Sequence, residues 1–333
     1  MKIAVYSAQP YDRRFLDEAR AALPAPGVEA VYFSDRLELD TVPLAQGCAA
    51  VCVFVNDLLD APVLEALHAL GVGAVLLRCA GFNNVDLQAG ARLGLFMARV
   101  PAYAPEAVAE HALALAMTLN RRTHRAYARV REGNFALDGL LGVTLHGKTV
   151  GIVGAGQIGA CAARIFHGLG CKVLVSDPAP TPQLDQVAER APLDALLAQS
   201  DVVSLHCPLM DATRHIINAA SLARMKPGAM LVNTSRGGLI DTAAVIEALK
   251  SGQLGALAID VYEQESTLFF QDHSSDIIAD DVFQRLMTFP NVLVTGHQGF
   301  FTIEAMREIA AVTFANLACH TQGSPCANAL PTT

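Results

Sequence analysis

Short runs of apolar and β-branched residues alternate along the chain with longer segments in which apolar residues recur every three to four positions. The short runs predict buried strands, and the longer segments predict amphipathic helices. A regular alternation of the two is typical of an α/β fold on parallel sheets. The strands predicted in the first third of the chain are Ile3–Tyr6, Val28–Phe33, Ala50–Val55, Ala74–Leu77 and Gly94–Ala98.

A second series of strands starts near the middle of the chain and predicts a second sheet. It consists of Thr149–Val153, Lys172–Ser176, Val202–Leu205, Ala229–Asn233, Ala256–Asp260 and Val292–Val294. The clearest helical segments are Phe15–Leu23, Pro62–Leu70, Ile158–Leu169, Thr302–His320 and a long one that starts at Pro105. The last helix has no strand after it. We therefore expect it to pack back on the first domain and to make that domain discontinuous.

The strand Thr149–Val153 runs into the sequence GAGQIG, which has the form G-x-G-x-x-G. In a dinucleotide-binding unit, Gly154 would allow the tight turn and Gly156 would let the backbone approach a pyrophosphate. Gly159 would let the following helix pack closely on the strand. Glycines also cluster in ordinary turns, but here a helix, a second strand and a terminal acid follow in the order that such a unit needs.

That acid is Asp177, which follows the strand Lys172–Ser176. A carboxylate in this place binds the hydroxyl groups of the adenosine ribose and repels a 2′-phosphate. The residues directly after it, Pro178 to Thr181, include no Arg or Lys. The sequence therefore favours NAD(H) over NADP(H).

Composition limits the class of protein and its partners. Hydrophobic residues make up 52% of the 333 residues and charged residues 17%, which indicates a globular chain of two-domain size. A net charge of −8 argues against a nucleic-acid partner. We also expect no membrane partner, because no apolar run reaches the length of a membrane span.

The eight cysteines form no C-x-x-C pair, so they predict neither a zinc site nor a disulfide framework. We expect no metal. The N-terminal segment lacks the apolar region and cleavage site of a signal peptide. Buried thiols without a signal peptide predict a cytoplasmic protein.

Polar side chains stand at the ends of three strands of the predicted second sheet: Arg236 and His297 follow their strands, and Asp260 ends its own. Ligands of open α/β sheets bind at the carboxyl ends of the strands. A nicotinamide enzyme for a 2-oxo acid must bind a carboxylate, polarise a ketone and deliver a proton. An Arg suits the first two tasks and a His the third, with a carboxylate beside it. Each residue alone could equally be a surface or capping residue.

Several segments resemble those of one known family: LRCAGFNNVDL, VGIVGAGQIG, LVNTSRGGLID, AIDVYEQES and VLVTGHQGF. The family is that of the D-2-hydroxyacid dehydrogenases, and within it the bacterial fermentative D-lactate dehydrogenases. The resemblance covers essentially the whole chain, and LRCAGFNNVDL and TGHQGF are its most specific parts. It implies two Rossmann-like parallel-sheet domains. The NAD-binding domain, residues 100–299, would be inserted in a discontinuous substrate domain of residues 1–99 and 300–333.

The resemblance also implies roles for individual residues. Arg236 would bind the substrate, His297 would be the acid/base group, and Glu265 would be its partner, with Glu263 as the next candidate. The substrate-binding residues would be Ala80, Gly81 and Tyr103, to which we add Phe300 because it follows His297 closely. The residues expected at the cofactor are Gly154, Gly156, Gln157, Ile158, Gly159, Asp177, Cys207, Pro208, Thr213, Thr234, Ser235 and Asp260. A homodimer or homotetramer is implied, through the long helix from Pro105.

These observations together predict an NAD-dependent D-lactate dehydrogenase that reduces pyruvate to D-lactate. One alternative is a dehydrogenase for a bulkier 2-oxo acid, against which the large side chains of Phe54, Tyr103, Phe300 and Phe301 argue. Another is a nucleotide-sensing regulatory protein on the same fold, since fold alone does not determine function. The presence of Arg236, Glu265 and His297 argues against the second.

Overall fold

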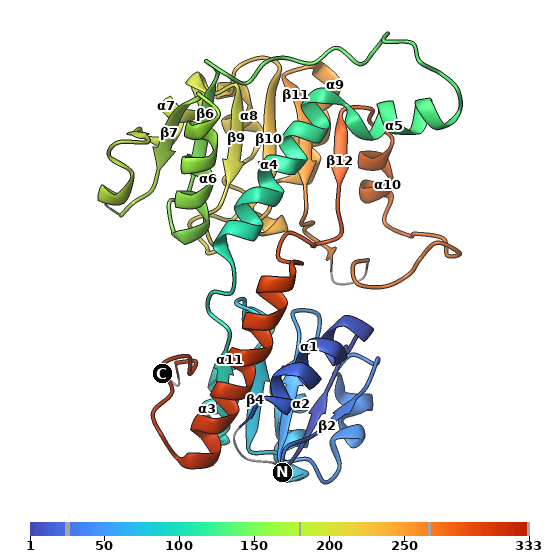
Figure 1. Ribbon diagram of the computed structural model, residues 1–333, viewed down its shortest axis with the longest axis vertical. Helices are drawn as coiled ribbons and strands as arrows, with labels where there is room; N and C mark the ends of the chain where they lie inside the picture. The colour runs from blue at the N-terminus through green and yellow to red at the C-terminus, as the bar shows by residue number, and fades with distance from the viewer. Residues whose placement is uncertain (24–26, 180, 266–267, 332–333) are drawn as a thin grey trace. The chain divides into compact units, whose positions relative to one another are not determined.

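The computed structural model describes residues 1–23, 27–179, 181–265 and 268–331. The chain divides into two compact units. The first contains Met1–Ala104 and Phe301–Thr333, so the blue and the red ends of the chain belong to one unit, and the second is the continuous stretch Pro105–Phe300 (Figure 1). The boundaries predicted from the sequence lie at 99/100 and 299/300. The substrate and NAD-binding roles of the two parts stay predictions.

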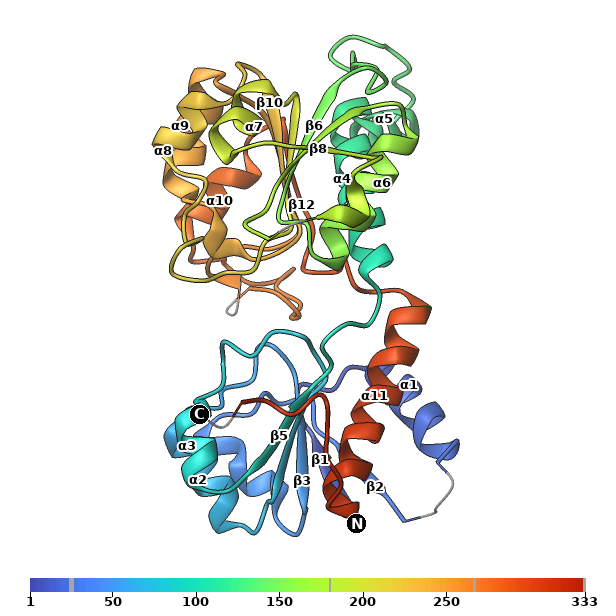
Figure 2. The same ribbon diagram turned by 90° about the vertical axis from the view of Figure 1, so that its left-hand side faces the viewer.

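The first unit is built on a five-stranded parallel sheet with the strand order β2-β1-β3-β4-β5. Its strands are β1 (Lys2–Val5), β2 (Glu29–Tyr32), β3 (Ala50–Val53), β4 (Ala74–Leu77) and β5 (Phe96–Arg99). Its helices are α1 (Pro10–Ala21), the 3-10 helix η1 (Leu39–Ala45), α2 (Ala61–Ala69), α3 (Leu87–Arg92) and α11 (Ile303–Gln322). Helices α1 and α11 lie together on one face of the sheet, and α2 and α3 lie on the other (Figure 2).

The end of the chain is bonded to the edge strand of this sheet. The side-chain amide of Asn316, on α11, donates a hydrogen bond to the carbonyl oxygen of Arg99 at 2.9 Å. Beyond the helix, the Arg99 N–H donates to the carbonyl oxygen of Asn328, and Ala329 forms an antiparallel bridge with Ala98. The last segment therefore completes a sheet that the first hundred residues begin.

The second unit has a seven-stranded parallel sheet with the order β12-β11-β10-β9-β6-β7-β8. Its strands are β6 (Thr149–Val153), β7 (Lys172–Ser176), β8 (Glu189–Arg190), β9 (Val202–Leu205), β10 (Ala229–Asn233), β11 (Leu254–Ile259) and β12 (Val292–Val294). Its helices are α4 (Pro105–Arg121), α5 (Thr123–Arg131), α6 (Gln157–Gly168), η2 (Pro182–Leu184), α7 (Leu193–Gln199), α8 (Ala219–Arg224), η3 (Gly237–Leu239), α9 (Thr242–Ser251) and α10 (Asp281–Met287).

Helices cover both faces of this sheet (Figure 2). One core packs α7, α8, α9 and α10 on one face, and the other packs α4 and α6 on the opposite face. The small residues Ala109, Ala112 and Ala116 are fully buried on α4. Small side chains on this helix let it approach α6 and the sheet closely. The three layers thus follow from strands that are apolar on both faces.

The strand order reverses between β6 and β9, because the chain builds the sheet outward from β6 in both directions. In open parallel sheets, ligands bind at the carboxyl ends of the strands on either side of such a reversal. The segments that follow β6 and β9 begin at Gly154 and His206. We therefore expect a ligand to bind at these two segments and at the carboxyl ends of the neighbouring strands.

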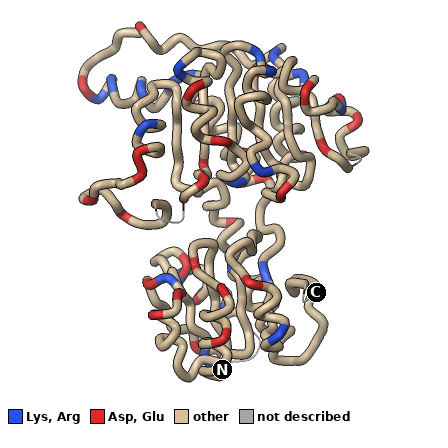
Figure 3. The backbone as a smooth tube through the Cα atoms, turned by 180° about the vertical axis from the view of Figure 1, so that it is seen from behind, with Lys and Arg blue, Asp and Glu red and all other residues tan. Residues whose placement is uncertain are grey.

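The expected α/β class with two parallel sheets is confirmed. Charged residues of both signs are interspersed along the backbone in the view of Figure 3. Among the described residues, no helix is long and apolar enough to span a membrane.

Candidate functional site

The three glycines after β6 differ in what an added Cβ atom would contact. Gly154 has φ +90°, and a Cβ there would lie 2.5 Å from the amide nitrogen of Cys207. A Cβ on Gly159 would overlap the carbonyl oxygen of Gly154. A Cβ on Gly156 would meet no atom within 4 Å. Gly154 and Gly159 are therefore required by the fold, whereas Gly156 leaves open space beside the first turn of α6. This is where a pyrophosphate needs it.

The carboxylate of Asp177 ties the end of β7 to the glycine-rich turn. One of its oxygens accepts a hydrogen bond from the Ala155 N–H and the other from the Ala179 N–H, both at 2.7 Å. The acid is thus held beside the turn, as binding of an adenosine ribose requires. Of the residues that follow it, Pro180 lies outside the described residues.

An arginine that the sequence pattern gave no reason to consider also lies at this point. Arg190, on β8, donates from its guanidinium to the carbonyl oxygen of Asp177 at 2.7 Å. It stands 13 positions further along the chain. Because β8 pairs with β7 in parallel, with Arg190 opposite Val175, the sheet brings it to the end of β7. The absence of Arg and Lys from residues 178–181 therefore does not leave Asp177 without a basic neighbour.

The segments after β9 and β10 are joined to each other. Ser235 donates from its hydroxyl to the carbonyl oxygen of Cys207 at 2.7 Å. Thr213 closes its own turn by donating to the carbonyl oxygen of Pro208 at 2.6 Å. The hydroxyl of Thr234 is buried and has no hydrogen-bond partner among the described residues. A buried hydroxyl group needs a hydrogen-bond partner, and the carboxamide group of a bound ligand would supply one. Burial raises the pKa of the Cys207 thiol to about 11, so this cysteine acts through packing and its backbone.

His297 and Glu265 form a pair beyond the end of β12. Nδ1 of His297 lies 2.9 Å from an oxygen of Glu265, and the other oxygen accepts a hydrogen bond from the Tyr262 N–H at 2.9 Å. Both side chains are about one fifth exposed, at 17% and 21%. Because the carboxylate occupies Nδ1, Nε2 is the nitrogen that can face a substrate.

The neighbouring Glu263 is engaged elsewhere. Its carboxylate lies 2.8 Å from Nε2 of His215 and 3.2 Å from the guanidinium of Arg214. The structure thus places Glu265, and not Glu263, beside His297.

A buried network fixes the backbone that carries His297. This residue has φ +53°, in the left-handed region, and its N–H donates to the carbonyl oxygen of Asp260. The carboxylate of Asp260 accepts hydrogen bonds from the Gln298 N–H at 2.9 Å and the Gly299 N–H at 2.8 Å. A strained conformation persists only where its surroundings determine it, and Asp260 supplies that constraint.

Two further groups hold Asp260 itself. Thr295 donates to its carboxylate, and Nε2 of His111, on α4, lies 3.3 Å from the same oxygen. Burial alone would raise the pKa of Asp260, but the hydrogen bonds from His111, Thr295 and Gln298 outweigh it and lower the pKa below its ordinary value. The side chain of Asp260 is buried. His111 is a residue that the sequence did not single out, because it stands in the middle of a helix.

Arg236 begins the segment after Ser235 and is partly exposed. Its guanidinium donates to the carbonyl oxygen of Ser235 at 2.7 Å. The backbone is held by Asn233, whose side chain donates to the carbonyl oxygen of Arg236 at 2.8 Å. Because β10, β11 and β12 are neighbours in the sheet, Arg236, Asp260 and His297 follow three adjacent strand ends.

In the first unit, two arginines brace the loop after β4. Arg78 is fully buried and donates to Asp12 at 3.2 Å and to the carbonyl oxygen of Ser7 at 2.8 Å. Arg99 donates to the carbonyl oxygen of Ala80 at 2.7 Å. The N–H groups of Ala80 and Gly81 have no partner among the described residues, so a ligand could accept hydrogen bonds from both. Tyr103 lies in the segment that leaves this unit.

Aromatic rings surround His297 within its own unit. The ring centroid of Phe270 lies 5.6 Å from that of the imidazole, and the centroid of Phe300 lies 6.5 Å away in an edge-on arrangement. Phe300 is buried, whereas Phe301 is about half exposed and packs on Tyr11 in the first unit. Apolar rings beside an acid/base group exclude water from it. No group of three metal-binding side chains occurs among the described residues.

This geometry agrees with one family of known proteins. The model of the D-isomer specific 2-hydroxyacid dehydrogenase NAD binding domain matches residues 113–299, more than half of the chain. The chain belongs to this family. It is an NAD-dependent oxidoreductase, as the glycine-rich turn and Asp177 predicted. The described residues fit the cofactor, since Gly156 leaves room beside α6 and the Thr234 hydroxyl is buried without a partner.

Relatives that match over almost the whole of this chain support the assignment. The chain is 60% identical to 2-hydroxyacid dehydrogenase A of Aspergillus oryzae, over 99% of this chain and 95% of that protein. It is 51% identical to D-lactate dehydrogenase of Escherichia coli, over 99% and 100%. The apo-structure of D-lactate dehydrogenase from Escherichia coli superposes with a TM-score of 0.91, at 48% identity over 99% and 100% of the two chains. A structure of D-lactate dehydrogenase with NAD+ from Lactobacillus jensenii superposes with a TM-score of 0.82, at 31% identity over 99% and 100%.

Proposed function

We propose that this dehydrogenase reduces pyruvate to D-lactate with NADH. The observation that carries the proposal is the pair of His297 and Glu265, whose side chains lie 2.9 Å apart. His297 follows β12, Asp260 follows the neighbouring strand β11, and Arg236 follows β10, which is the next strand in the sheet. Such a pair supplies a proton, and an arginine nearby supplies a fork for a 2-oxo acid. Relatives named D-lactate dehydrogenase support D-lactate as the hydroxy acid of this reaction.

In this proposal the bound nicotinamide supplies a hydride to the carbonyl carbon. His297 donates a proton from Nε2 to the carbonyl oxygen, and Glu265 stabilises the positively charged imidazole and fixes its orientation. Arg236 binds the carboxylate and polarises the carbonyl group. Ala80, Gly81 and Tyr103 keep their predicted roles as hydrogen-bond donors to the substrate, and Phe300 its predicted contact with the methyl group.

The remaining residues of the proposed cofactor site act through their backbone or their place in the fold. Gln157 and Ile158 open α6, so their N–H groups belong to the positive end of that helix. Pro208 and Thr213 shape the turn after Cys207, and Ser235 anchors it. Asp260 contributes by holding the loop of His297.

The substrate test compares pyruvate, 2-oxobutyrate, hydroxypyruvate and phenylpyruvate as oxidants of NADH. We expect the highest kcat/KM with pyruvate. A preference for phenylpyruvate would identify a dehydrogenase for a bulkier acid. Phe300→Ala should shift the ratio of 2-oxobutyrate to pyruvate activity upward, and an unchanged ratio would remove Phe300 from the substrate site.

A nucleotide sensor would bind NADH but turn over no 2-oxo acid. If the protein is an enzyme, Arg236→Lys should lower kcat/KM for pyruvate roughly 10²-fold, because an ammonium group lacks the planar fork of a guanidinium group. Its affinity for NADH should stay unchanged. Full activity of this variant would show that Arg236 has been assigned the wrong role.

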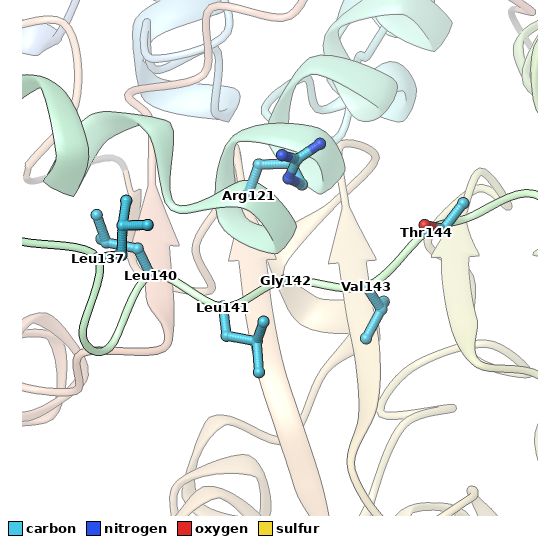
Figure 4. A pocket seen from close by; sticks show the side chains of 7 residues that line it. All are labelled: Arg121, Leu137, Leu140, Leu141, Gly142, Val143 and Thr144. Atoms are coloured by element: carbon cyan, nitrogen blue, oxygen red, sulfur yellow. The ribbon is translucent and has the colours of Figure 1, made fainter.

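We further propose that the dehydrogenase is a homo-oligomer that uses an arm of the second unit, defined as α5 and the loop up to Thr144. The arm leaves the end of α4 and returns to it, where Asn120 exchanges two hydrogen bonds with Val143 (Figure 1). Its apolar side chains face outward, with Phe135 73%, Leu137 82% and Leu141 87% exposed. Leu137, Leu140 and Leu141 of this arm are among the residues that line a hollow of about 350 Å³, and Figure 4 shows their side chains. Exposed apolar surface of this kind marks an interface.

We also propose a cytoplasmic location. The eight cysteines form no disulfide among the described residues, which suits a reducing compartment.

A further inference from the structure

Two groups of opposite charge lie at the adenosine end of the proposed cofactor site, Asp177 and Arg190. The acid is already engaged, since each of its oxygens accepts a backbone N–H, from Ala155 and Ala179. Arg190 is exposed and forms no ion pair with a described residue. Its one hydrogen bond goes to the carbonyl oxygen of Asp177 at 2.7 Å. The guanidinium therefore keeps its charge and most of its donors available beside the acid.

The acid next to Arg190 in the chain is paired with another residue. Its neighbour Glu189 lies 3.1 Å from Lys172, at the opposite end of β7. Consecutive residues of a strand point to opposite faces of the sheet. Arg190 is thus a cation without an ion-pair partner among the described residues, at the end of β7 where the ribose hydroxyl groups are expected.

We propose that Arg190 determines cofactor specificity by binding the 2′-phosphate of NADP(H), so that this dehydrogenase accepts both dinucleotides. Asp177 favours NAD(H) by repelling the phosphate, and Arg190 offsets part of that repulsion. Its planar donor group matches a phosphate, and such charge-assisted hydrogen bonds are among the stronger ones. The inference rests on the proposed cofactor site at Asp177, and it adds a determinant from β8, a strand outside the glycine-rich motif.

The test measures binding by calorimetry and needs no turnover. NAD+ and NADP+ are titrated into the full-length protein and into Arg190→Gln, whose amide can still donate to the Asp177 carbonyl oxygen but carries no charge. We expect the wild type to bind both, NAD+ more tightly. Arg190→Gln should weaken NADP+ binding roughly tenfold and NAD+ binding less than about twofold. Arg190→Lys should retain part of the NADP+ affinity, because it keeps the charge.

A matched control is Arg224→Gln, which removes an exposed arginine that pairs with Asp194 in the same unit. It should leave both affinities unchanged. The fragments 5′-AMP and 2′,5′-ADP repeat the comparison without nicotinamide, and only the second should lose affinity in Arg190→Gln. Higher salt should reduce the difference, since the contact is exposed.

Three results would overturn the assignment. NADP+ binding that is undetectable while NAD+ binds would show that Arg190 does not offset Asp177. An equal loss of both affinities in Arg190→Gln would show that it contacts the part that the dinucleotides share. If NAD+ itself fails to bind, the proposed cofactor site is wrong, and the role of Arg190 is overturned with it. The first two results leave the proposed reaction intact, because NAD+ still binds.

Discussion

His297 is held in the left-handed backbone region by Asp260, while its ring is oriented by Glu265. Asp260 thus fixes the backbone of His297, and Glu265 fixes the orientation of its side chain. The sequence could name the arginine, the histidine and Asp260, because each stands at the end of a predicted strand. It could not choose between Glu263 and Glu265 from spacing, and only the resemblance favoured Glu265. The structure explains the difference, since His215 and Arg214 occupy Glu263.

The two glutamates form a matched pair for mutation. Glu265→Gln keeps the shape but removes the charge beside the imidazole, so kcat/KM for pyruvate should fall by about 10²-fold. Glu263→Gln should change it by less than about twofold. Steady-state assays with NADH check both. Should the two variants lose activity in the opposite order, the partner of His297 is Glu263.

A second histidine makes a prediction about stability and pH. His206 is partly buried, with its Nδ1 inaccessible, and burial lowers its pKa to about 4. Unfolding returns it to an ordinary value near 6.5, so between these values the unfolded chain binds more protons. The free energy of unfolding should therefore fall as pH drops from about 6.5 toward 4, by up to about 1.4 kcal/mol per pH unit from this group.

Urea unfolding at pH 7, 6 and 5 tests this. The difference in stability between wild type and His206→Gln should shrink as the pH falls. A constant difference for His206→Gln would mean that the buried histidine does not titrate between the two states.

At the scale of elements, apolar runs predicted the bounds of the strands most accurately. Strands β4, β6, β7, β9, β10 and β12 begin and end where the sequence predicted. The strand β8 was missed because it is only two residues long and both are charged, Glu189 and Arg190. No local sequence pattern predicts such a strand, because it forms only by pairing with the otherwise unpaired edge of β7. The residue that it carries, Arg190, was missed for the same reason.

The turn between β6 and α6 offers a test of why its glycines are there. Gly159→Ala should lower the melting temperature, because the new Cβ would overlap the carbonyl oxygen of Gly154. Gly156→Ala should leave the melting temperature unchanged, since nothing lies within 4 Å of its Cβ, yet it should weaken NADH binding by crowding the pyrophosphate. Thermal melts and NADH titrations separate the two. A Gly156→Ala protein with full NADH affinity would place the pyrophosphate elsewhere.

At the scale of the whole molecule, the exposed arm should control assembly. Replacing Leu137 and Leu141 together by Glu should convert the oligomer to a monomer, because charged side chains cannot be buried without partners. Sedimentation equilibrium measures the mass. Ile277→Glu is the control, since Ile277 is 96% exposed outside the arm and its replacement should leave the mass unchanged. A wild-type monomer, or a double variant that keeps its mass, would exclude the arm as the interface.

The bonding of the last segment to β5 has a consequence for how the chain matures during synthesis. The strands β1–β5 leave the ribosome before the second unit, but α11 and the bridge between Ala98 and Ala329 exist only after the second unit has been made. The second unit is one continuous stretch and can fold while the first unit is still incomplete. The part of the protein that is made first is thus finished last. Termination of synthesis between Phe300 and Asn328 would therefore damage the unit that contains β1–β5 and leave the second unit intact.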